Sequence, residues 1–227
     1  MDINPKIFRE YDIRGIVGQD LDEATVEILG RAIGTYFLGR GQKGTAVGRD
    51  CRLSSPGFGR ALIRGLTSTG CDVTDIGVVP TPLLYFSVFH LGMPAGVMVT
   101  GSHNPPEHNG FKMMSGRDTL YGKTIQALYG IVRKGVFPRG EGRLETLDVA
   151  ATYRDYVAAN VRLARPVKVV IDAGNGTGGA VAVPLLRRMG AEVVELFCEP
   201  DGRFPNHHPD PTLPEAMEAL VARVRET

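Results

Sequence analysis

Apolar side chains recur at helical spacing in several segments and gather into short runs between those segments. In residues 22–38 they stand three or four positions apart, which predicts a helix that begins after Asp22. Ser55-Pro56 and Thr81-Pro82 each join a capping residue to a proline and predict two more helix starts. The other predicted helices are 124–134, 149–163, a segment that ends near Gly190, and one that begins near Pro214.

Short apolar runs between the helices predict strands. They lie at 45–48, 73–79, 95–100, 111–114, 167–171 and 192–197. Because strands and helices alternate, we expect an α/β fold with mixed, mostly parallel sheets flanked by helices. Residues 135–148 are rich in glycine, proline and charge, which predicts a linker. We therefore expect two consecutive α/β domains, at 1–147 and 148–227. The second is expected to be incomplete, because an α/β domain normally has at least one more strand than this segment predicts.

Composition narrows the class of protein. Lys and Arg number 26 against 25 Asp and Glu, and this balance argues against a partner that is nucleic acid or a membrane surface. The three cysteines form no C-x-x-C pair, which is typical of a reduced, cytoplasmic protein. The first residues lack the apolar stretch of a signal peptide, and no apolar run approaches the ~20 residues that span a bilayer. We therefore expect a cytoplasmic protein.

The stretch that follows the third predicted strand reads TGSHNPPEHNGFK. Ligands of α/β sheets gather at the carboxyl ends of parallel strands, and Ser102 lies just past such an end. His103 and Asn104 beside it can donate hydrogen bonds to an oxyanion. Asn109-Gly110 predicts a tight turn, which would bring Lys112 back toward the serine.

A serine with a nearby lysine and several donors suits phosphate that is held or moved on oxygen. Such chemistry consists mostly of positioning and charge stabilisation. The same residue types also suit an ordinary turn with an exposed His103. A serine hydrolase is disfavoured, because the residues around Ser102 do not form G-x-S-x-G. From these residues alone, phosphate chemistry and a plain turn both stay open.

TGSHNPPEHNGFK closely resembles the phosphoserine loop of the α-D-phosphohexomutases, in the phosphomannomutase/phosphoglucomutase branch. Other segments resemble segments of that family in the same order along the chain. They are FREYDIRG (8–15), GRDCRLSS (48–55), PTPLLYF (80–86), IDAGNGTGG (171–179) and FPNHHPDP (204–211). This ordered set covers nearly the whole chain and is far more specific than one motif. The chain is identified as a member of that family, from its N-terminal half.

The resemblance implies an isomerase that interconverts hexose 1-phosphate and hexose 6-phosphate, of mannose and/or glucose. Ser102 would carry the phosphoryl group, with hexose 1,6-bisphosphate as intermediate and activator. Lys112 and Arg14 match the cations beside the phosphoserine, and His103 completes the catalytic set. Mg²⁺ would bind the phosphate on Ser102. The residues implied in substrate or phosphate binding are Tyr11, Asn104 and Asn109.

The sequence departs from the family at the metal. The family's Asp-Gly-Asp-x-Asp-Arg loop has no match here, and Asp20-Leu21-Asp22 stands at a helix start, where it is most simply a cap. The chain is therefore predicted to be roughly the first half of a mutase, truncated before the metal loop. Its partners would be a phosphosugar and the missing C-terminal half, and alone it would turn over substrate poorly. The alternative is a non-catalytic sugar-phosphate binding module of the same fold.

Other motifs are weaker. The turn at 174–179 partly fits a dinucleotide fingerprint, but Asp172 before it would repel a pyrophosphate. A structural turn is favoured, and a nucleotide-dependent enzyme is kept as a lesser alternative. Residues 207–210 could bind metal, although adjacent histidines rarely point at one ion. The charged residues predicted to form an internal ion-pair network are Arg49, Asp50 and Arg52.

Overall fold

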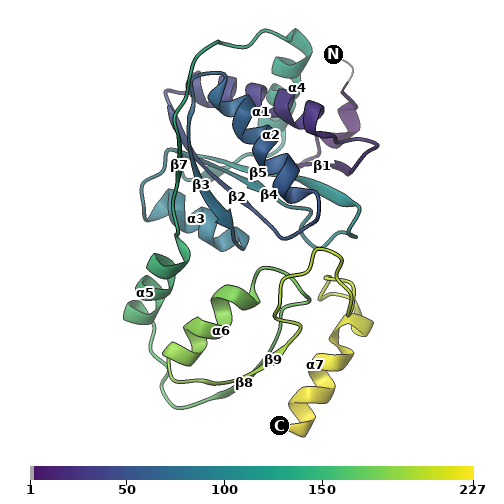
Figure 1. The fold of residues 1–227 in the computed structure, drawn as a ribbon, viewed down its shortest axis with the longest axis vertical. Helices are drawn as coiled ribbons and strands as arrows, with labels where there is room; N and C mark the ends of the chain where they lie inside the picture. Colours follow the sequence, from purple (N-terminus) through teal and green to yellow (C-terminus); the bar gives the residue numbers. More distant parts are fainter. Residues whose placement is uncertain (1–2) are drawn as a thin grey trace.

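A computed structural model describes residues 3–227, which form two sheets, each flanked by helices (Figure 1). The strands of the larger sheet are β1 (Ile13–Ile16), β2 (Gly44–Arg49), β3 (Asp72–Val78), β4 (Ala95–Val99), β5 (His108–Ser115), β6 (Asp118–Thr119) and β7 (Leu144–Thr146). They lie in the order β1-β5-β4-β2-β3-β7, with β6 paired to β5. The helices around this sheet are a 3-10 turn (Pro5–Ile7), α1 (Glu23–Leu38), α2 (Ser55–Thr67), α3 (Thr81–Phe89) and α4 (Lys123–Lys134).

The strand pairing brings several strand ends to one edge of the larger sheet. β4 pairs with β2, β2 with β3, and β3 with β7, all in parallel. β5 runs antiparallel to both β4 and β1. The predicted mixed α/β fold is confirmed. The segment after β4 lies at the carboxyl edge, where ligands of such sheets gather.

Both faces of the larger sheet are covered, which explains the unbroken apolar run of β4. Val97 and Val99 belong to the core cluster that includes residues of α1, α2 and α4, whereas Met98 belongs to the cluster that includes residues of α3. Successive side chains of a strand point to opposite faces. Every residue of β4 is therefore buried. Figure 1 shows α1 and α2 on one side of the sheet and α3 on the other.

The smaller sheet pairs β8 (Lys168–Asp172) with β9 (Glu192–Leu196) in parallel. The helices of this second unit are α5 (Ala150–Asn160), α6 (Gly179–Arg188) and α7 (Pro214–Glu226). Phe86 of α3 meets Tyr153 of α5 edge-on, with ring centroids 5.3 Å apart. Val181 of α6 belongs to the same core cluster as the apolar residues of α3. The two units are thus packed together by apolar side chains.

One prediction about an irregular segment is wrong, and a second segment contains a strand that was not predicted. The tight turn predicted at Asn109-Gly110 is absent, because both residues lie within β5 of the described chain and Gly110 pairs with Arg14 of β1. A Cβ on Gly110 would collide with the carbonyl of Ile13, so this glycine permits the close approach of two strands. The segment 135–148, predicted as a linker, contains the edge strand β7, which pairs with β3.

The helices begin where the sequence predicts, except that the capping residues of two helices differ from those predicted. Asp22 caps α1 as predicted and accepts from the backbone N of Thr25 at 2.7 Å. Ser55 and Thr81 are the first residues of their helices, so those caps fall one residue earlier. None of the helices within residues 3–227 combines the length and the apolar character that crossing a membrane requires.

Candidate active site

The loop after β4 holds Ser102 in an exposed position. Its backbone is left-handed, with a φ of 56°, a conformation that costs a residue with a Cβ about 1 kcal/mol or more. Two contacts hold it there. The backbone N of Ser102 donates to Oγ1 of Thr100 at 2.9 Å, and its carbonyl accepts from Nη2 of Arg52 at 2.9 Å. The serine hydroxyl therefore projects from a backbone that is fixed on both sides.

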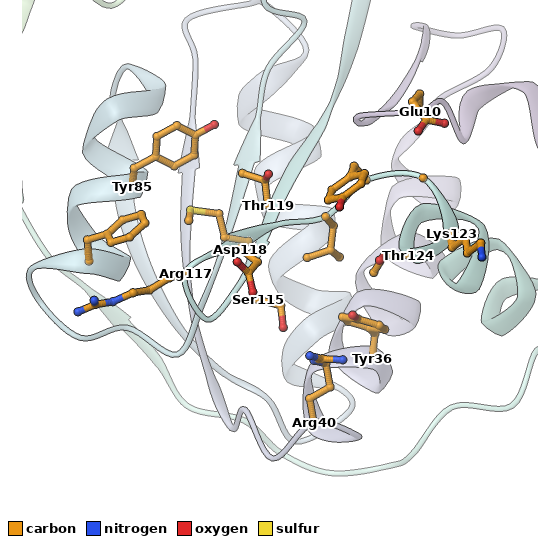
Figure 2. A pocket seen from close by; sticks show the side chains of 15 residues that line it. Glu10, Tyr36, Arg40, Tyr85, Ser115, Arg117, Asp118, Thr119, Lys123 and Thr124 are labelled. Carbon is orange, nitrogen blue, oxygen red and sulfur yellow. The ribbon is translucent and has the colours of Figure 1, made fainter.

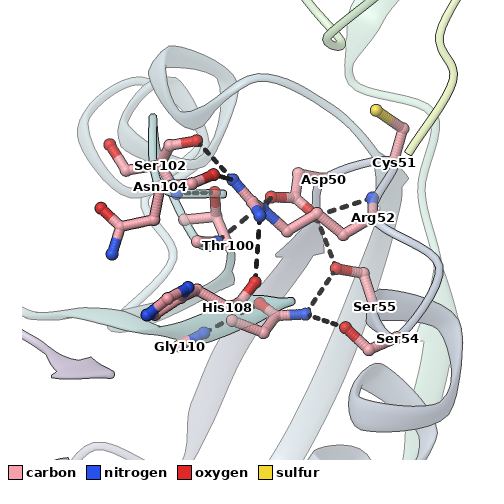
Figure 3. A network of polar contacts seen from close by, with 12 residues as sticks. Asp50, Cys51, Arg52, Ser54, Ser55, Thr100, Ser102, Asn104, His108 and Gly110 are labelled. Atoms are coloured by element: carbon pink, nitrogen blue, oxygen red, sulfur yellow. Dashed lines mark hydrogen bonds and ion pairs between the residues drawn. The ribbon is translucent and has the colours of Figure 1, made fainter. Parts of the chain in front are cut away.

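Arg52 lies beneath this loop and is fully buried (Figure 3). Nη2 donates to the carbonyl oxygens of Ser102 and Asn104, at 2.9 and 2.6 Å. Nη1 donates to those of Pro105 and His108, at 2.6 and 3.0 Å. Burial lowers the pKa of the Arg52 guanidinium from its usual value, yet an arginine stays charged in proteins. The carbonyls of the loop thus converge on one buried cation.

Asp50, just after β2, completes this support. Its carboxylate accepts from Nε of Arg52 at 3.2 Å and from the backbone N of Gly101 at 3.3 Å. The hydroxyl of Ser55 donates to the same carboxylate at 2.5 Å. The predicted internal ion-pair network is confirmed, with Arg52 paired to Asp50 and Arg49 paired to a carboxylate of β3.

Asn109 supports the loop from below. It is fully buried, and its Nδ2 donates to the hydroxyls of Ser54 and Ser55, at 2.8 and 3.0 Å. Its Oδ1 accepts from the backbone N of Gly110 at 2.8 Å. The side-chain amide of Asn109 is therefore buried and already hydrogen-bonded within the protein. No contact in the structure supports the prediction that it binds phosphate.

Two predicted cations meet at one carboxylate beside the loop. Arg14 of β1 pairs with Asp12, and Nζ of Lys112 on β5 lies 3.6 Å from Oδ2 of the same Asp12. Nη1 of Arg14 donates to Oδ1 of Asn104 in the loop at 2.8 Å. Nε of Arg14 is buried and has no hydrogen-bond partner among residues 3–227. Buried donors normally have a partner, so this nitrogen is an unsatisfied donor within the described residues.

A cavity of about 310 Å³ lies beside Lys112, and Tyr11, Tyr85 and Tyr121 contribute to its lining. Tyr11, a predicted substrate contact, is 73% exposed. A larger cavity of about 890 Å³ shares Tyr85 and Tyr121 with it. Figure 2 shows the larger one, which extends from Tyr85 on α3 to Lys123 on α4. Of the described residues that line the larger cavity, none is a predicted site residue, so the smaller one is the candidate for substrate.

His103 is exposed in the loop. Hydrogen bonds from Thr212 lower the pKa of Asp210, and the charge of His103 adds to that lowering. Asp210 belongs to the segment 204–211.

The carboxylates around the loop do not form a metal site. Within the described part of the chain, no group of three or more His, Cys, Asp or Glu side chains could hold a metal ion. Asp12 is engaged by Arg14 and Lys112, and Asp50 by Arg52. Mg²⁺ requires several oxygen ligands in octahedral geometry. The carboxylates of Asp12 and Asp50 therefore do not fit Mg²⁺. The one ligand that this loop could offer the ion is a phosphate oxygen carried on Ser102.

His207, part of the candidate metal motif, is instead paired within the second unit. Its Nε2 lies 3.0 Å from Oδ2 of Asp172, and its Nδ1 lies 2.9 Å from the carbonyl oxygen of His208. Both partners are acceptors, so both ring nitrogens carry protons when both bonds are made. Burial opposes this charge, but the bonds to His208 and Asp172 outweigh it and raise the pKa of His207.

The glycine-rich turn between β8 and α6 is organised by Asn175. This residue is buried and left-handed, with a φ of 57°. Its Nδ2 donates to the carbonyl of Glu199 at 3.0 Å, and its Oδ1 accepts from Asn206 at 2.7 Å. A Cβ on Gly179 would lie 2.6 Å from the carbonyl oxygen of Cys198. These contacts support the structural turn over a nucleotide-binding loop.

Three features of the site were not predicted from the sequence. Thr100 accepts from the backbone N of Ser102, Asp12 pairs with Arg14, and Arg52 is buried beneath the loop. One signal was present for Asp12. It precedes Arg14 by two positions, and residues two apart in an extended segment share a face. The convergence of carbonyls on Arg52 has no such signal, because the loop lies about 50 positions away in the sequence.

Comparisons with known proteins agree with this geometry. Residues 5–139 match the family model of phosphoglucomutase/phosphomannomutase α/β/α domain I, and residues 151–227 match that of domain II. A phosphomannomutase/phosphoglucomutase of Pseudomonas putida is 48% identical over 221 residues, which are 97% of this chain and 48% of that protein. A phosphoglucomutase of Neisseria gonorrhoeae is 48% identical over 225 residues, 98% of this chain and 49% of that protein.

A crystal structure of a phosphoglucomutase/phosphomannomutase family protein from Burkholderia thailandensis superposes with a TM-score of 0.96 at 42% identity. The superposition covers 100% of this chain and 51% of the Burkholderia thailandensis protein. The chain thus spans about half the length of the curated relatives it matches. Since family models match both of its units in order, the chain belongs to the phosphoglucomutase/phosphomannomutase family.

Proposed function

We propose that this chain is the phosphoryl-carrying part of a phosphohexose mutase. In this proposal Ser102 accepts a phosphoryl group from a hexose 1,6-bisphosphate and returns it to a hexose 1- or 6-phosphate. One observation carries the proposal. An exposed serine with a fixed, left-handed backbone stands on a loop that is tied to Arg14, and Lys112 shares the carboxylate partner of that arginine.

In the transfer to the protein, a bond forms between Oγ of Ser102 and phosphorus, and the bond between phosphorus and the sugar oxygen breaks. The hydroxyl proton of Ser102 ends on the sugar oxygen, with Lys112 as the proposed relay. The return step reverses these changes at the other sugar position. Atoms and charge therefore balance without any further reactant.

The cations of the site stabilise the charge that spreads over the phosphoryl oxygens during transfer. Arg14 is tied to the loop through Asn104 and to Asp12, so its charge would act on a phosphate carried by Ser102. Lys112 borders the smaller cavity together with Tyr11, which places a cation and an aromatic ring where a sugar phosphate would enter. His103 and Asn104 complete the proposed set, since they adjoin Ser102 in the same loop.

The substrate class follows from the relatives. Their names specify mannose and glucose phosphates, so we propose one or both of these for the complete protein. We also propose that Mg²⁺ binds through the phosphate on Ser102, with further ligands from outside the described residues. Turnover by this chain alone should be low, because the relatives use a chain about twice as long.

The test is an intact-mass measurement with peptide mapping, before and after incubation with glucose 1,6-bisphosphate and Mg²⁺. We expect the mass of one phosphoryl group on Ser102 and none in Ser102→Ala. Ser115→Ala, at the far end of β5, is the matched serine control and should be loaded like the wild type.

A phosphoryl group on a residue other than Ser102 would overturn the proposal. So would the absence of any mass increase when the matching C-terminal half of a relative is added in trans. If glucose 6-phosphate still bound under that last condition, the chain would be a sugar-phosphate binding module.

A further inference from the structure

Arg52 has an unusual combination of burial and hydrogen bonding. Its guanidinium is fully excluded from solvent, and a buried charge is unfavourable unless every donor has a partner. An arginine has five N–H donors in a fixed planar fork. Three of them reach carbonyl oxygens of the loop between β4 and β5 (residues 100–107, the serine loop), one reaches the carbonyl of His108 at the start of β5, and the fifth reaches Asp50. All five N–H groups of the planar guanidinium have partners only when the loop backbone adopts this one conformation.

The carbonyls that Arg52 engages set the loop's shape around Ser102. One belongs to Ser102 itself, whose left-handed backbone needs support from its surroundings. Gly101 is packed directly on the guanidinium, since a Cβ at that position would lie 2.5 Å from Cζ of Arg52. The serine loop can keep this path only while the guanidinium keeps its position.

The second unit covers the same guanidinium. The ring of Phe204 lies over Arg52, with 5.1 Å between Cζ and the ring centroid. Phe204 has a φ of 49°, and a bulky side chain adopts such a conformation only when its surroundings hold it. The backbone of Gly202 lies against that of Cys51 and Arg52 so closely that a Cβ would collide with it.

The segment that carries Phe204 is itself anchored in the second unit through Asn175. The carbonyl of Asn175 accepts from the backbone N of Asp201 at 2.8 Å, and its side chain binds Glu199 and Asn206 on either side of Phe204. A continuous path of contacts therefore runs from the turn after β8, through Phe204 and Arg52, to the carbonyl of Ser102.

We propose that Arg52 is a positioning residue of the serine loop, and that Phe204 of the second unit holds its guanidinium in place across the boundary between the units. The geometry of Ser102 then depends on the docking of the second unit. This inference deepens the proposed function and rests on it for its catalytic meaning. Its structural content can be tested without any phosphoryl transfer.

The primary test is amide hydrogen exchange of the unphosphorylated chain, read by mass spectrometry or NMR. In Phe204→Leu we expect the hydrogen-bonded amides of Gly101, Ser102 and Asn104 to exchange about tenfold faster or more. The reason is that weakened support lowers the free energy of local opening. Amides of α1 should exchange at the wild-type rate. Phe204→Tyr keeps the ring over the guanidinium and should restore wild-type protection of the loop.

The chain offers a matched control pair. Arg117 lies over the ring of Phe89, with 5.6 Å between Cζ and the centroid, and neither residue contacts Arg52 or Phe204 among the described interactions. Phe89→Leu and Arg117→Lys should leave the exchange of the Gly101, Ser102 and Asn104 amides unchanged. Arg52→Lys should accelerate it more than Phe204→Leu does, because an ammonium cannot reproduce the planar fork.

Two exchange results would overturn the proposal. One is unchanged loop exchange in Phe204→Leu. The other is an increase spread equally over the loop and α1, which would indicate a general loss of stability. If Arg52→Lys fails to fold, Gly101→Ala tests the same contact from the loop side and should also accelerate exchange locally.

The rate of phosphoryl uptake separates this inference from the proposed function. If the wild type is loaded on Ser102, Phe204→Leu should be loaded about tenfold more slowly at a similar melting temperature. An equal rate would overturn the positioning role. If the wild type is not loaded at all, the proposed function fails, and the exchange data still decide whether Arg52 and Phe204 fix the loop.

Discussion

Arg14 donates from Nη1 to Oδ1 of Asn104 at 2.8 Å, across 90 positions of sequence. This bond joins β1 to the serine loop and orients the guanidinium that also pairs with Asp12. The bond matters because a planar guanidinium can serve several acceptors at once, in fixed directions.

Replacing Arg14 with lysine should therefore separate charge from geometry. We expect Arg14→Lys to slow phosphoryl uptake by Ser102 by roughly ten- to a hundredfold, because an ammonium cannot bind Asp12, Asn104 and a phosphate in the same directions. A time course of intact mass measures the rate. Arg9→Lys, at an exposed position of the same N-terminal segment, is the control and should behave as the wild type. Equal rates for both variants would remove Arg14 from the site.

The two asparagines of the loop region should respond differently to truncation. Asn109→Ala leaves the hydroxyls of Ser54 and Ser55 without their buried donor, so we expect the free energy of unfolding to fall by about 1–3 kcal/mol. Asn104→Ala should change it much less and should slow phosphoryl uptake instead. Urea denaturation and the mass assay together distinguish the outcomes. A loss of uptake in Asn109→Ala without a loss of stability would revive the phosphate contact predicted from sequence.

The pair of His207 and Asp172 predicts a pH dependence of stability. Hydrogen bonds raise the pKa of His207 above its usual 6.5 despite burial. The charged form is favoured by folding, so the stabilisation is fully present below pH 6.5 and is lost as pH rises through the folded-state pKa. We expect the wild type to lose stability relative to His207→Gln as pH rises above 6.5, measured by urea denaturation. His208→Gln is the matched control and should keep the wild-type slope, and a slope of opposite sign would contradict the pairing.

Two helical glycines should give effects of opposite sign when replaced by alanine. Gly65 of α2 packs on α1 so tightly that a Cβ would collide with the carbonyl of Glu27, whereas Gly130 of α4 faces open space. We expect Gly65→Ala to destabilise the fold by about 1–3 kcal/mol, and Gly130→Ala to stabilise it by about 0.5–1 kcal/mol. Thermal or urea unfolding measures both. A stabilising Gly65→Ala would mean that α1 and α2 can separate freely.

Cys51 should be a slow nucleophile although it is only partly buried. Burial, and then the charge of Asp50, raise the pKa of its thiol to about 11. Since the thiolate is the reactive form, alkylation by iodoacetamide at pH 8 should be about a hundredfold slower than for a thiol of pKa 9. Peptide mapping identifies the labelled cysteine, and the urea-unfolded chain provides the unperturbed rate. Rapid labelling of Cys51 in the folded chain would show that its contact with the second unit opens readily.

Much of the architecture was predictable because it is encoded locally. The cap at Asp22, the proline-started helices and the apolar run of β4 each depend on residues close in sequence, so propensity and periodicity suffice. The predictions fail where distant contacts override local signals. Asn109-Gly110 has the composition of a tight turn, yet its close approach to β1 keeps it in a strand. Residues 144–146 look like linker, yet β3 offers them a free edge.

The sequence by itself determined the α/β layers, the chemistry placed on the loop after β4, and the ordered motifs that identify the family. The tertiary structure alone decided how that loop is held. Arg52, Phe204 and Asp12 come from three separate segments, and their meeting around Ser102 depends on the order of strands in the sheet and on the packing of the second unit. Local patterns record which side chains are available, whereas a buried charge is tolerable only where distant partners converge on it.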